Sequence, residues 1–178
     1  MEIGSGTPAG PRRRLLAFCW DYLVILTYLV PLVGLGVLIN RFAPEVAAAL
    51  FESPLKAQAM GFMLITLPVA LYFVLSEAST RQATYGKRRL SLVVQDVNGS
   101  RIGISRSIVR TAAKFTPWEL AHYFIWQSSF SDSPESPVFA AGFVTVWVLV
   151  GGDLAAMFFG RKYRTLHDRI SGTSVVRM

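Results

Sequence analysis

Hydrophobic positions along the chain gather into three long runs that are separated by polar and charged segments. Residues 15–39 and residues 138–160 each contain one charged side chain, and residues 57–76 contain none. A helix needs about 20 apolar residues to cross the hydrocarbon core of a bilayer. Each run is long enough, so the pattern predicts an all-α membrane protein rather than a soluble helical bundle.

A fourth segment, residues 107–130, is a weaker candidate for a membrane span. It carries four ionisable side chains and Pro117 among its apolar and aromatic residues. Long basic side chains near one end of such a helix can extend back to the interface. The alternative is a re-entrant segment or an interfacial helix that does not cross.

The 18 basic residues favour four crossings over three. Three of them lie in residues 12–14, eight in residues 81–114 and five in residues 161–177. Basic residues next to short loops stay on the cytoplasmic side of a membrane. Four crossings place all three groups on that side, whereas three crossings would place the last group outside. We therefore expect four membrane helices, with the third one weak, and both termini in the cytoplasm.

The polar segments also carry a β pattern. Residues 88–105 predict a small cytoplasmic β-hairpin, because alternating apolar residues precede Asn98-Gly99, a typical hairpin turn. The cytoplasmic tail, residues 161–178, contains a further β-type run that predicts a third strand. We expect one membrane domain over residues 1–178.

Two carboxylates interrupt the apolar runs. Asp21 lies seven residues after Arg14, and Asp153 lies eight residues before Arg161. With a rise of 1.5 Å per residue, both lie about 10–12 Å from the predicted cytoplasmic edge. A charge at this depth needs a partner or a wet cavity. Two close carboxylates share a proton or bind a cation between them.

These considerations predict a proton or cation site formed by Asp21, Asp153, Glu119 and His122. Glu119 and His122 lie one helical turn apart, in the inner half of the weak third span. The alternative is structural. Asp21 and Arg14 share one helix face, so that an ion pair between them would fix helix packing.

The sequence offers no catalytic or metal-binding pattern. It has a single cysteine, no Gly-x-Ser-x-Gly segment and no His pattern of a zinc site. His167-Asp168 lies among basic residues, and we expect Asp168 to pair with a neighbouring one. We therefore expect no enzyme activity, no cofactor and no metal. The net charge of +7 follows from the topology, and it needs no nucleic-acid partner.

Three separated segments resemble the RDD family of bacterial membrane proteins. "RRRLLAFCWDYLVI" is similar to the start of that family, which has an arginine and then an aspartate in the first helix. "EASTRQATYGKRRLSLVVQDVNGSRIG" and "RKYRTLHDRISGTSVV" are similar to its middle and closing segments. The matching positions are Arg14 (or Arg13), Asp21, Thr84, Gly86, Lys87, Arg88, Leu166, His167, Asp168, Gly172 and Thr173, with Asp168 as the second aspartate.

This resemblance implies a multi-pass protein of the bacterial inner membrane. It also implies transport of unidentified ligands, and cation–proton antiport has been suggested for members. We expect transport of a proton or monovalent cation, with Asp21 and Asp153 in the path. A protomer of four helices encloses little space, so we expect a homo-oligomer or a partner membrane protein. The alternative is a scaffold that binds a partner or anionic lipid through its cytoplasmic basic face.

Overall fold

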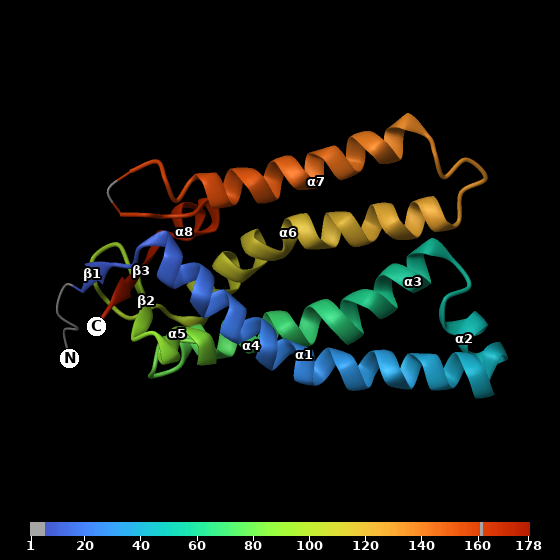
Figure 1. The fold of residues 1–178 in the computed structure, drawn as a ribbon, viewed down its shortest axis with the longest axis horizontal. Helices are drawn as coiled ribbons and strands as arrows, with labels where there is room; N and C mark the ends of the chain where they lie inside the picture. The colour runs from blue at the N-terminus through green and yellow to red at the C-terminus, as the bar shows by residue number, and fades with distance from the viewer. Residues whose placement is uncertain (1–5, 161) are drawn as a thin grey trace.

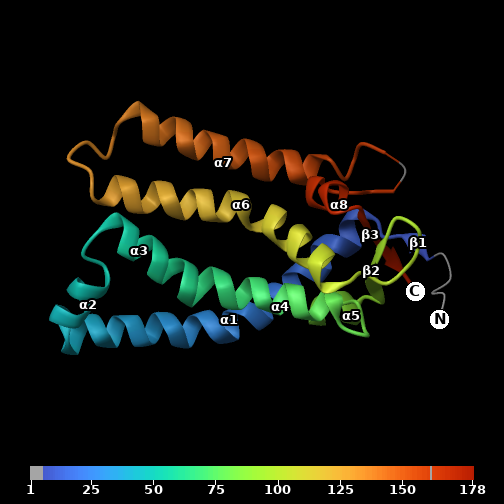
Figure 2. The same cartoon turned by 180° about the vertical axis from the view of Figure 1, so that it is seen from behind.

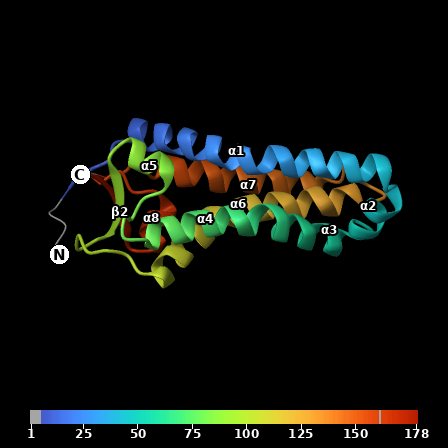
Figure 3. The same ribbon diagram turned by 90° about the horizontal axis from the view of Figure 1, so that it is seen from below.

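Long helices form an elongated bundle in the computed structural model, which describes residues 6–160 and 162–178 (Figure 1). A small sheet and short helices lie at one end of the bundle, here called the sheet end (Figure 3). The long helices are α1 (Pro11–Phe42), α3 (Pro54–Gly61) with its π-helical continuation η1 (Phe62–Thr66) and α4 (Leu67–Ala78), α6 (Ile104–Ser129) and α7 (Pro137–Ala155). The short elements are α2 (Pro44–Leu50), α5 (Tyr85–Arg89), α8 (Leu166–Ile170), β1 (Thr7–Pro8), β2 (Leu92–Asp96) and β3 (Thr173–Arg177).

In the described part of the chain, three helices are long and apolar enough to cross a membrane: α1, the continuous helix Pro54–Ala78 and α7. They contain the three predicted apolar runs, except that α7 ends at Ala155 instead of residue 160. Their apolar side chains are largely exposed, as expected for surfaces that face lipid. The structure and the composition agree on these three helices.

The weak third span is a continuous helix and not a re-entrant loop. α6 has 26 residues and packs against α3, α4 and α7. Figure 2 shows that its first turns run at an angle to the rest. Pro117 explains a bend, because proline cannot donate to the carbonyl four residues earlier. Its crossing of the membrane remains a prediction.

The second apolar helix contains one turn of π-helix, and a proline accounts for it. Pro68 follows η1 and has no N–H to donate to the carbonyl of Leu64. The Tyr28 hydroxyl of α1 donates to that carbonyl instead, at 2.8 Å. This hydrogen bond links α1 to the helix in the middle of the bundle.

The sheet differs from the predicted hairpin. Its strand order is β1-β3-β2, and the tail strand β3 is central and antiparallel to both neighbours. The third strand in the tail is therefore confirmed, and β2 lies where alternation predicted a strand. The predicted hairpin is reduced to a single antiparallel bridge across the turn at Asn98-Gly99. Only Arg101 bridges back to Gln95 before α6 begins.

Another segment occupies the edge of β2 that the hairpin required. The backbone N–H of Val94 donates to the carbonyl of Gln82, and the Gln82 side chain donates to the carbonyl of Val94, both at 2.8 Å. Ile102 is buried in the small core under the sheet instead of lying in a strand. The residues after Asn98-Gly99 therefore pack under the sheet and then begin α6, and they do not form a second strand.

Candidate functional site

Asp21 is buried at the contact between α1 and α5. Its carboxylate accepts hydrogen bonds from the Tyr72 hydroxyl at 2.7 Å, the Thr84 hydroxyl at 2.6 Å and the Gly86 N–H at 2.7 Å. The side chain is 1 % exposed. Three neutral donors thus compensate for the loss of water around the carboxylate. Asp21 connects α1 to α4 and α5.

Gly86 allows α5 to approach α1 closely. A Cβ atom at this position would lie 2.0 Å from the backbone oxygen of Ala17 and 2.9 Å from the Asp21 carboxyl carbon. Only glycine fits without moving one of the helices. Thr84, which binds Asp21, also caps the N-terminus of α5 by accepting from the Lys87 N–H. The segment around Gly86 is therefore shaped by its contact with Asp21.

Asp168 joins both ends of the chain to α6. Its carboxylate pairs with Arg14 at 2.6 Å and with Arg110. It also closes a capping box with Thr165 at the start of α8. Burial alone would raise the pKa of Asp168, but Arg110 and Arg14 lower it well below its usual range. Asp168 is therefore a buried anion held by two guanidinium groups.

Glu77 extends this network on the other side of Arg110. It is fully buried and pairs with Arg110 Nε at 2.8 Å and with Lys87 Nζ at 2.9 Å. Arg110 also donates to the Thr173 hydroxyl at 2.7 Å. Gly172, just before Thr173, has a φ of +62° and turns the chain from α8 into β3. The closing segment of the chain is thereby fastened to α6.

Asp153 and His167 form a separate pair. His167 donates to Asp153 from its backbone N–H at 3.0 Å and lies with Nδ1 2.9 Å from the carboxylate. Burial lowers the pKa of His167 to about 4, although Asp153 acts in the opposite direction. His167 is therefore neutral at pH 7, with Nδ1 as the donor to Asp153.

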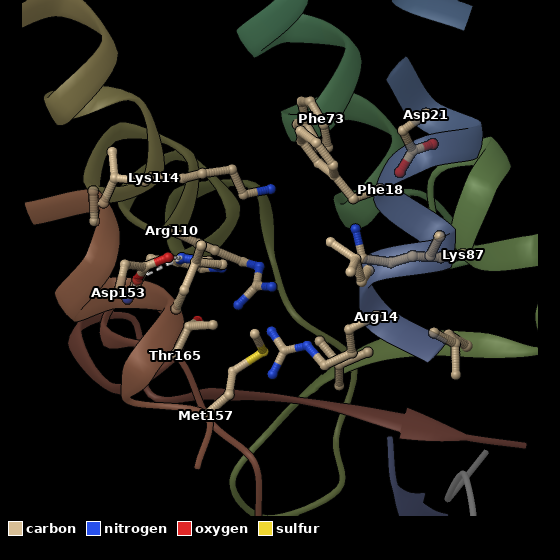
Figure 4. A pocket seen from close by; sticks show the side chains of 18 of the residues that line it. Arg14, Phe18, Asp21, Phe73, Lys87, Arg110, Lys114, Asp153, Met157 and Thr165 are labelled. Carbon is tan, nitrogen blue, oxygen red and sulfur yellow. Dashed lines mark hydrogen bonds and ion pairs between the residues drawn. The ribbon is translucent and has the colours of Figure 1, made fainter. Parts of the chain in front are cut away.

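These groups surround a cavity of about 370 Å³ between α1, α6 and α7 at the sheet end. Figure 4 shows the nitrogen atoms of four basic side chains directed toward its middle, with Asp21 and Asp153 at opposite sides. The remaining lining is mainly apolar. The four basic residues are Arg14, Lys87, Arg110 and Lys114.

Lys114 is the least compensated of these cations. Its nearest carboxylate oxygen among the described residues is Glu77 Oε1, at 3.9 Å. Its ammonium nitrogen lies 3.9 Å from the centroid of the Phe73 ring. A cation over an aromatic ring is stabilised modestly, by about 0.5–2 kcal/mol. The four cations at this end of the bundle thus have two fully buried carboxylates, Glu77 and Asp168, as their ion-pair partners.

Glu119 and His122 belong to another polar cluster, which is away from this cavity. Glu119 accepts from the Thr66 hydroxyl and, at 2.9 Å, from the Gln58 amide, and it lies 3.3 Å from His122 Nδ1. Thr66 is the last residue of the π-helical turn. Turns of this kind are frequent at functional positions.

The structure brings the predicted site residues together in a different way from the sequence interpretation. Asp21 and Asp153 do not share a ligand position, and each has its own donors. The structural alternative, an ion pair of Asp21 with Arg14, is wrong, because Arg14 binds Asp168. Of the motif residues, Arg88 is exposed and stacks on Tyr85 with its guanidinium carbon 6.0 Å from the ring centroid.

The predicted pairing of Asp168 with a sequence neighbour is also wrong. Arg164 donates to the carbonyls of Asp168 and Thr173, and Arg169 donates to the carbonyl of Ala156. Sequence reasoning missed Glu77 and the pairing role of Arg110. One signal was available, since Glu77 directly follows the apolar run 57–76 and Arg110 lies near the start of residues 107–130, so both charges lie near the predicted cytoplasmic edge.

Residues 6–160 and 162–178 contain no group of three or more His, Cys, Asp or Glu side chains placed to hold a metal ion. The buried polar groups are instead arranged as ion pairs and hydrogen bonds.

Comparison with known protein families gives a match over most of the chain. The model of the RDD family matches residues 8–172. No curated protein and no solved structure matches the chain. The matched range includes Arg14, Asp21, the segment around Gly86 and Asp168. These residues form the buried contacts of Asp21 with α5 and of Asp168 with Arg14.

Proposed function

The chain belongs to the RDD family, and from that premise we propose that this membrane protein crosses the bilayer four times and binds an anionic ligand in its cation-lined cavity. The observation that carries the proposal is the convergence of Arg14, Lys87, Arg110 and Lys114 on one cavity. The role is binding and not catalysis.

Four crossings are supported by the course of α6. It begins beside the sheet end and ends at the opposite end of the bundle, and α7 returns beside it (Figure 1). The sheet, α5 and α8 then lie on one side, together with the three basic segments of the chain. By the positive-inside rule that side is the cytoplasm of a bacterial inner membrane.

The hydrogen bonding of the network, and not its net charge, supports an anion as ligand. The four cations around the cavity are matched in number by four carboxylates, Asp21, Glu77, Asp153 and Asp168. Each buried carboxylate already accepts from two or more donors. In the described part of the chain, no hydrogen bond is formed by Lys114 Nζ or by Arg110 Nη2. These donors face the cavity, and an anion between them would gain charge-assisted hydrogen bonds.

Thermal unfolding in maltoside micelles tests the proposal, with inorganic phosphate as the probe and chloride at equal ionic strength as the reference. A ligand that binds the folded state stabilises it by about 2.7 kcal/mol at one hundred times its dissociation constant. Phosphate should raise the unfolding temperature of the wild type and of Lys162→Met, a control at an exposed lysine of the same end.

The Lys114→Met variant should lose this response, provided that it keeps its helical circular dichroism and its elution volume. Equal effects of phosphate and chloride on the wild type would contradict the proposal. An undiminished phosphate effect in Lys114→Met would also contradict it.

Transport of a proton or monovalent cation is a second candidate function, favoured by the Glu119 cluster. Glu119 and His122 lie within hydrogen-bonding reach of each other beside the π-helical turn, inside the helical bundle. Proton movement into liposomes driven by sodium or potassium gradients tests it. Glu119→Gln should abolish the flux, and Glu52→Gln, at an exposed position, should not. Absence of flux in the wild type would remove this candidate.

A further inference from the structure

We propose that the ligand of the cavity is an anionic membrane phospholipid, whose phosphate lies among the four cations and whose acyl chain lies along the apolar wall. This inference rests on the proposed function and names the ligand class of the same site.

The cavity walls have two chemical halves. The basic side chains come from α1, α5 and α6, and they meet around the two buried carboxylates at the sheet end. The rest of the lining is mainly hydrocarbon, from residues such as Leu15, Phe18, Phe73, Val150, Leu154 and Met157. Asp21, Asp153, Thr165 and His167 are its other polar members, and each already has hydrogen-bond partners. A small inorganic anion would leave this hydrocarbon surface against water, whereas an amphiphile covers both halves.

The apolar wall is continuous with the surface that faces lipid. Leu15, Phe18 and Leu154 line the cavity, yet they are 58 %, 53 % and 47 % exposed. Leu15 and Phe18 lie on α1, and Leu154 lies on α7, so the opening is between these two membrane helices. A lipid from the adjacent leaflet can therefore enter sideways, without leaving the bilayer.

The polar half matches the headgroup in charge and lies at the sheet end, which is the cytoplasmic side in the proposed topology. Basic pockets between membrane helices on the cytoplasmic side bind the phosphates of anionic lipids. Here a phosphodiester oxygen would reach Lys114 Nζ and Arg110 Nη2, neither of which has a hydrogen bond among the described residues. The aliphatic parts of the lysine and arginine side chains would pack against the acyl chain of the lipid. Their charged ends would stay in contact with its phosphate.

Native mass spectrometry of the protein in maltoside tests the lipid assignment. The probes are phosphatidylglycerol, phosphatidylcholine and glycerol 3-phosphate, which is a headgroup without chains. The wild type should retain one phosphatidylglycerol per protein and at least tenfold less phosphatidylcholine at equal concentration. Lys114→Met should lose the retained phosphatidylglycerol, and Lys162→Met should retain it.

A second variant separates the two halves of the site. Ala113 lines the cavity on α6, next to Lys114. Ala113→Phe fills apolar space and leaves all four cations in place, so it should lose phosphatidylglycerol and still be stabilised by free phosphate. Thermal unfolding without ligand shows whether each variant is folded.

The outcomes distinguish this inference from the proposed function. Binding of glycerol 3-phosphate or phosphate without preferential retention of phosphatidylglycerol would overturn the lipid assignment and leave the anion site intact. Binding of none of the three probes by the wild type would overturn both. Equal retention of phosphatidylglycerol and phosphatidylcholine would also overturn the lipid assignment, because charge would then not select the ligand.

Discussion

At the scale of single residues, two of the cations of α6, Arg110 and Lys114, have opposite roles. Arg110 compensates two buried carboxylates, Glu77 and Asp168, whereas Lys114 lies 3.9 Å from its nearest carboxylate oxygen among the described residues. Removal of one partner of a buried ion pair leaves an uncompensated charge and costs about 3–5 kcal/mol. An under-compensated cation, by contrast, contributes little to stability and remains available to a ligand.

We therefore predict that Arg110→Met lowers the free energy of unfolding by about 3–5 kcal/mol. Lys114→Met should leave it unchanged or raise it in phosphate-free buffer. Chemical unfolding in micelles, followed by circular dichroism, measures both. An equally large loss in Lys114→Met would show that Lys114 is part of the structural network and not a ligand group.

The close contact at Gly86 gives a second prediction. A methyl group at this position collides with the backbone of α1, so Gly86→Ala should separate α5 from α1 and break the hydrogen bonds of Asp21. We expect a loss of about 2–4 kcal/mol, in the range of severe packing and hydrogen-bond defects. Gly151→Ala in α7 is the control, since a Cβ there meets nothing within 4 Å. Similar stability of the two variants would refute the close contact.

The buried His167 gives a third prediction, on pH dependence. Its pKa is about 4 in the folded protein and 6.5 in the unfolded chain. Between these values the unfolded chain binds more protons, so stability falls as the pH falls from about 6.5 to 4. The loss is on the order of 3 kcal/mol.

His167→Asn should flatten this part of the stability profile. The carboxyl group of Asp168 affects the stability of the fold at still lower pH. Its pKa is depressed, so its contribution is present above its ordinary pKa and is lost as the pH falls through the folded-state value. An unchanged slope between pH 6.5 and 4 in His167→Asn would exclude a buried neutral His167.

At the scale of elements, the π-helical turn and α1 depend on each other. Pro68 leaves the Leu64 carbonyl without its usual donor, and Tyr28 of α1 supplies one. Tyr28→Phe should therefore cost about 0.6–2 kcal/mol, the range for hydrogen bonds between membrane helices. In a Pro68→Ala background, residue 68 has an N–H of its own, and Tyr28→Phe should cost less. A double-mutant cycle measures this coupling, and equal costs in both backgrounds would contradict the account.

Some elements could be predicted from the sequence and others could not. Apolar runs determine the three apolar helices, because length and hydropathy are local properties. The alternation of apolar and polar residues likewise predicted the strand β2. The second strand of the hairpin does not form beyond one bridge, and the sequence does not reveal that Gln82 occupies the free edge of β2 instead.

The partners of the site residues are equally non-local. Arg14 and Asp21 share a helix face, which suggested a pair, but Arg14 binds Asp168 near the other end of the chain. Thr84 and Gly86, which bind Asp21, are separated from it by more than sixty residues. The resemblance to the RDD family indicated which of these residues belong to the family motifs, but not which of them contact one another.

At the scale of the whole molecule, the four-crossing topology makes a prediction about thiol accessibility. With Cys19 replaced by serine, a cysteine at Ser133, between α6 and α7, should react with a membrane-impermeant thiol reagent added to intact cells. A cysteine at Asn98, at the sheet end, should react only after the membrane is permeabilised. Protection of both positions would place α6 on the membrane surface and contradict the fourth crossing.

The whole fold also explains why the cavity lies where it does. The networks of Asp21 and Asp168 hold α1, α5, α6 and α8 together at the sheet end, and the walls diverge toward the lipid-exposed side chains of α1 and α7. The buried charges are thereby fixed by the fold, and Lys114 remains directed into the cavity (Figure 4). The central claim is that this arrangement binds an anion.

The most direct test of that claim observes the lysines themselves. The chain has four lysines, at positions 56, 87, 114 and 162. With ¹³C at lysine Cε, each gives its own correlation peak in an NMR spectrum of the protein in micelles. The account predicts that added inorganic phosphate shifts the peaks of Lys114 and Lys87 in a saturable way and leaves those of Lys56 and Lys162 in place. Equal small shifts at all four lysines, or an unmoved Lys114, would contradict it.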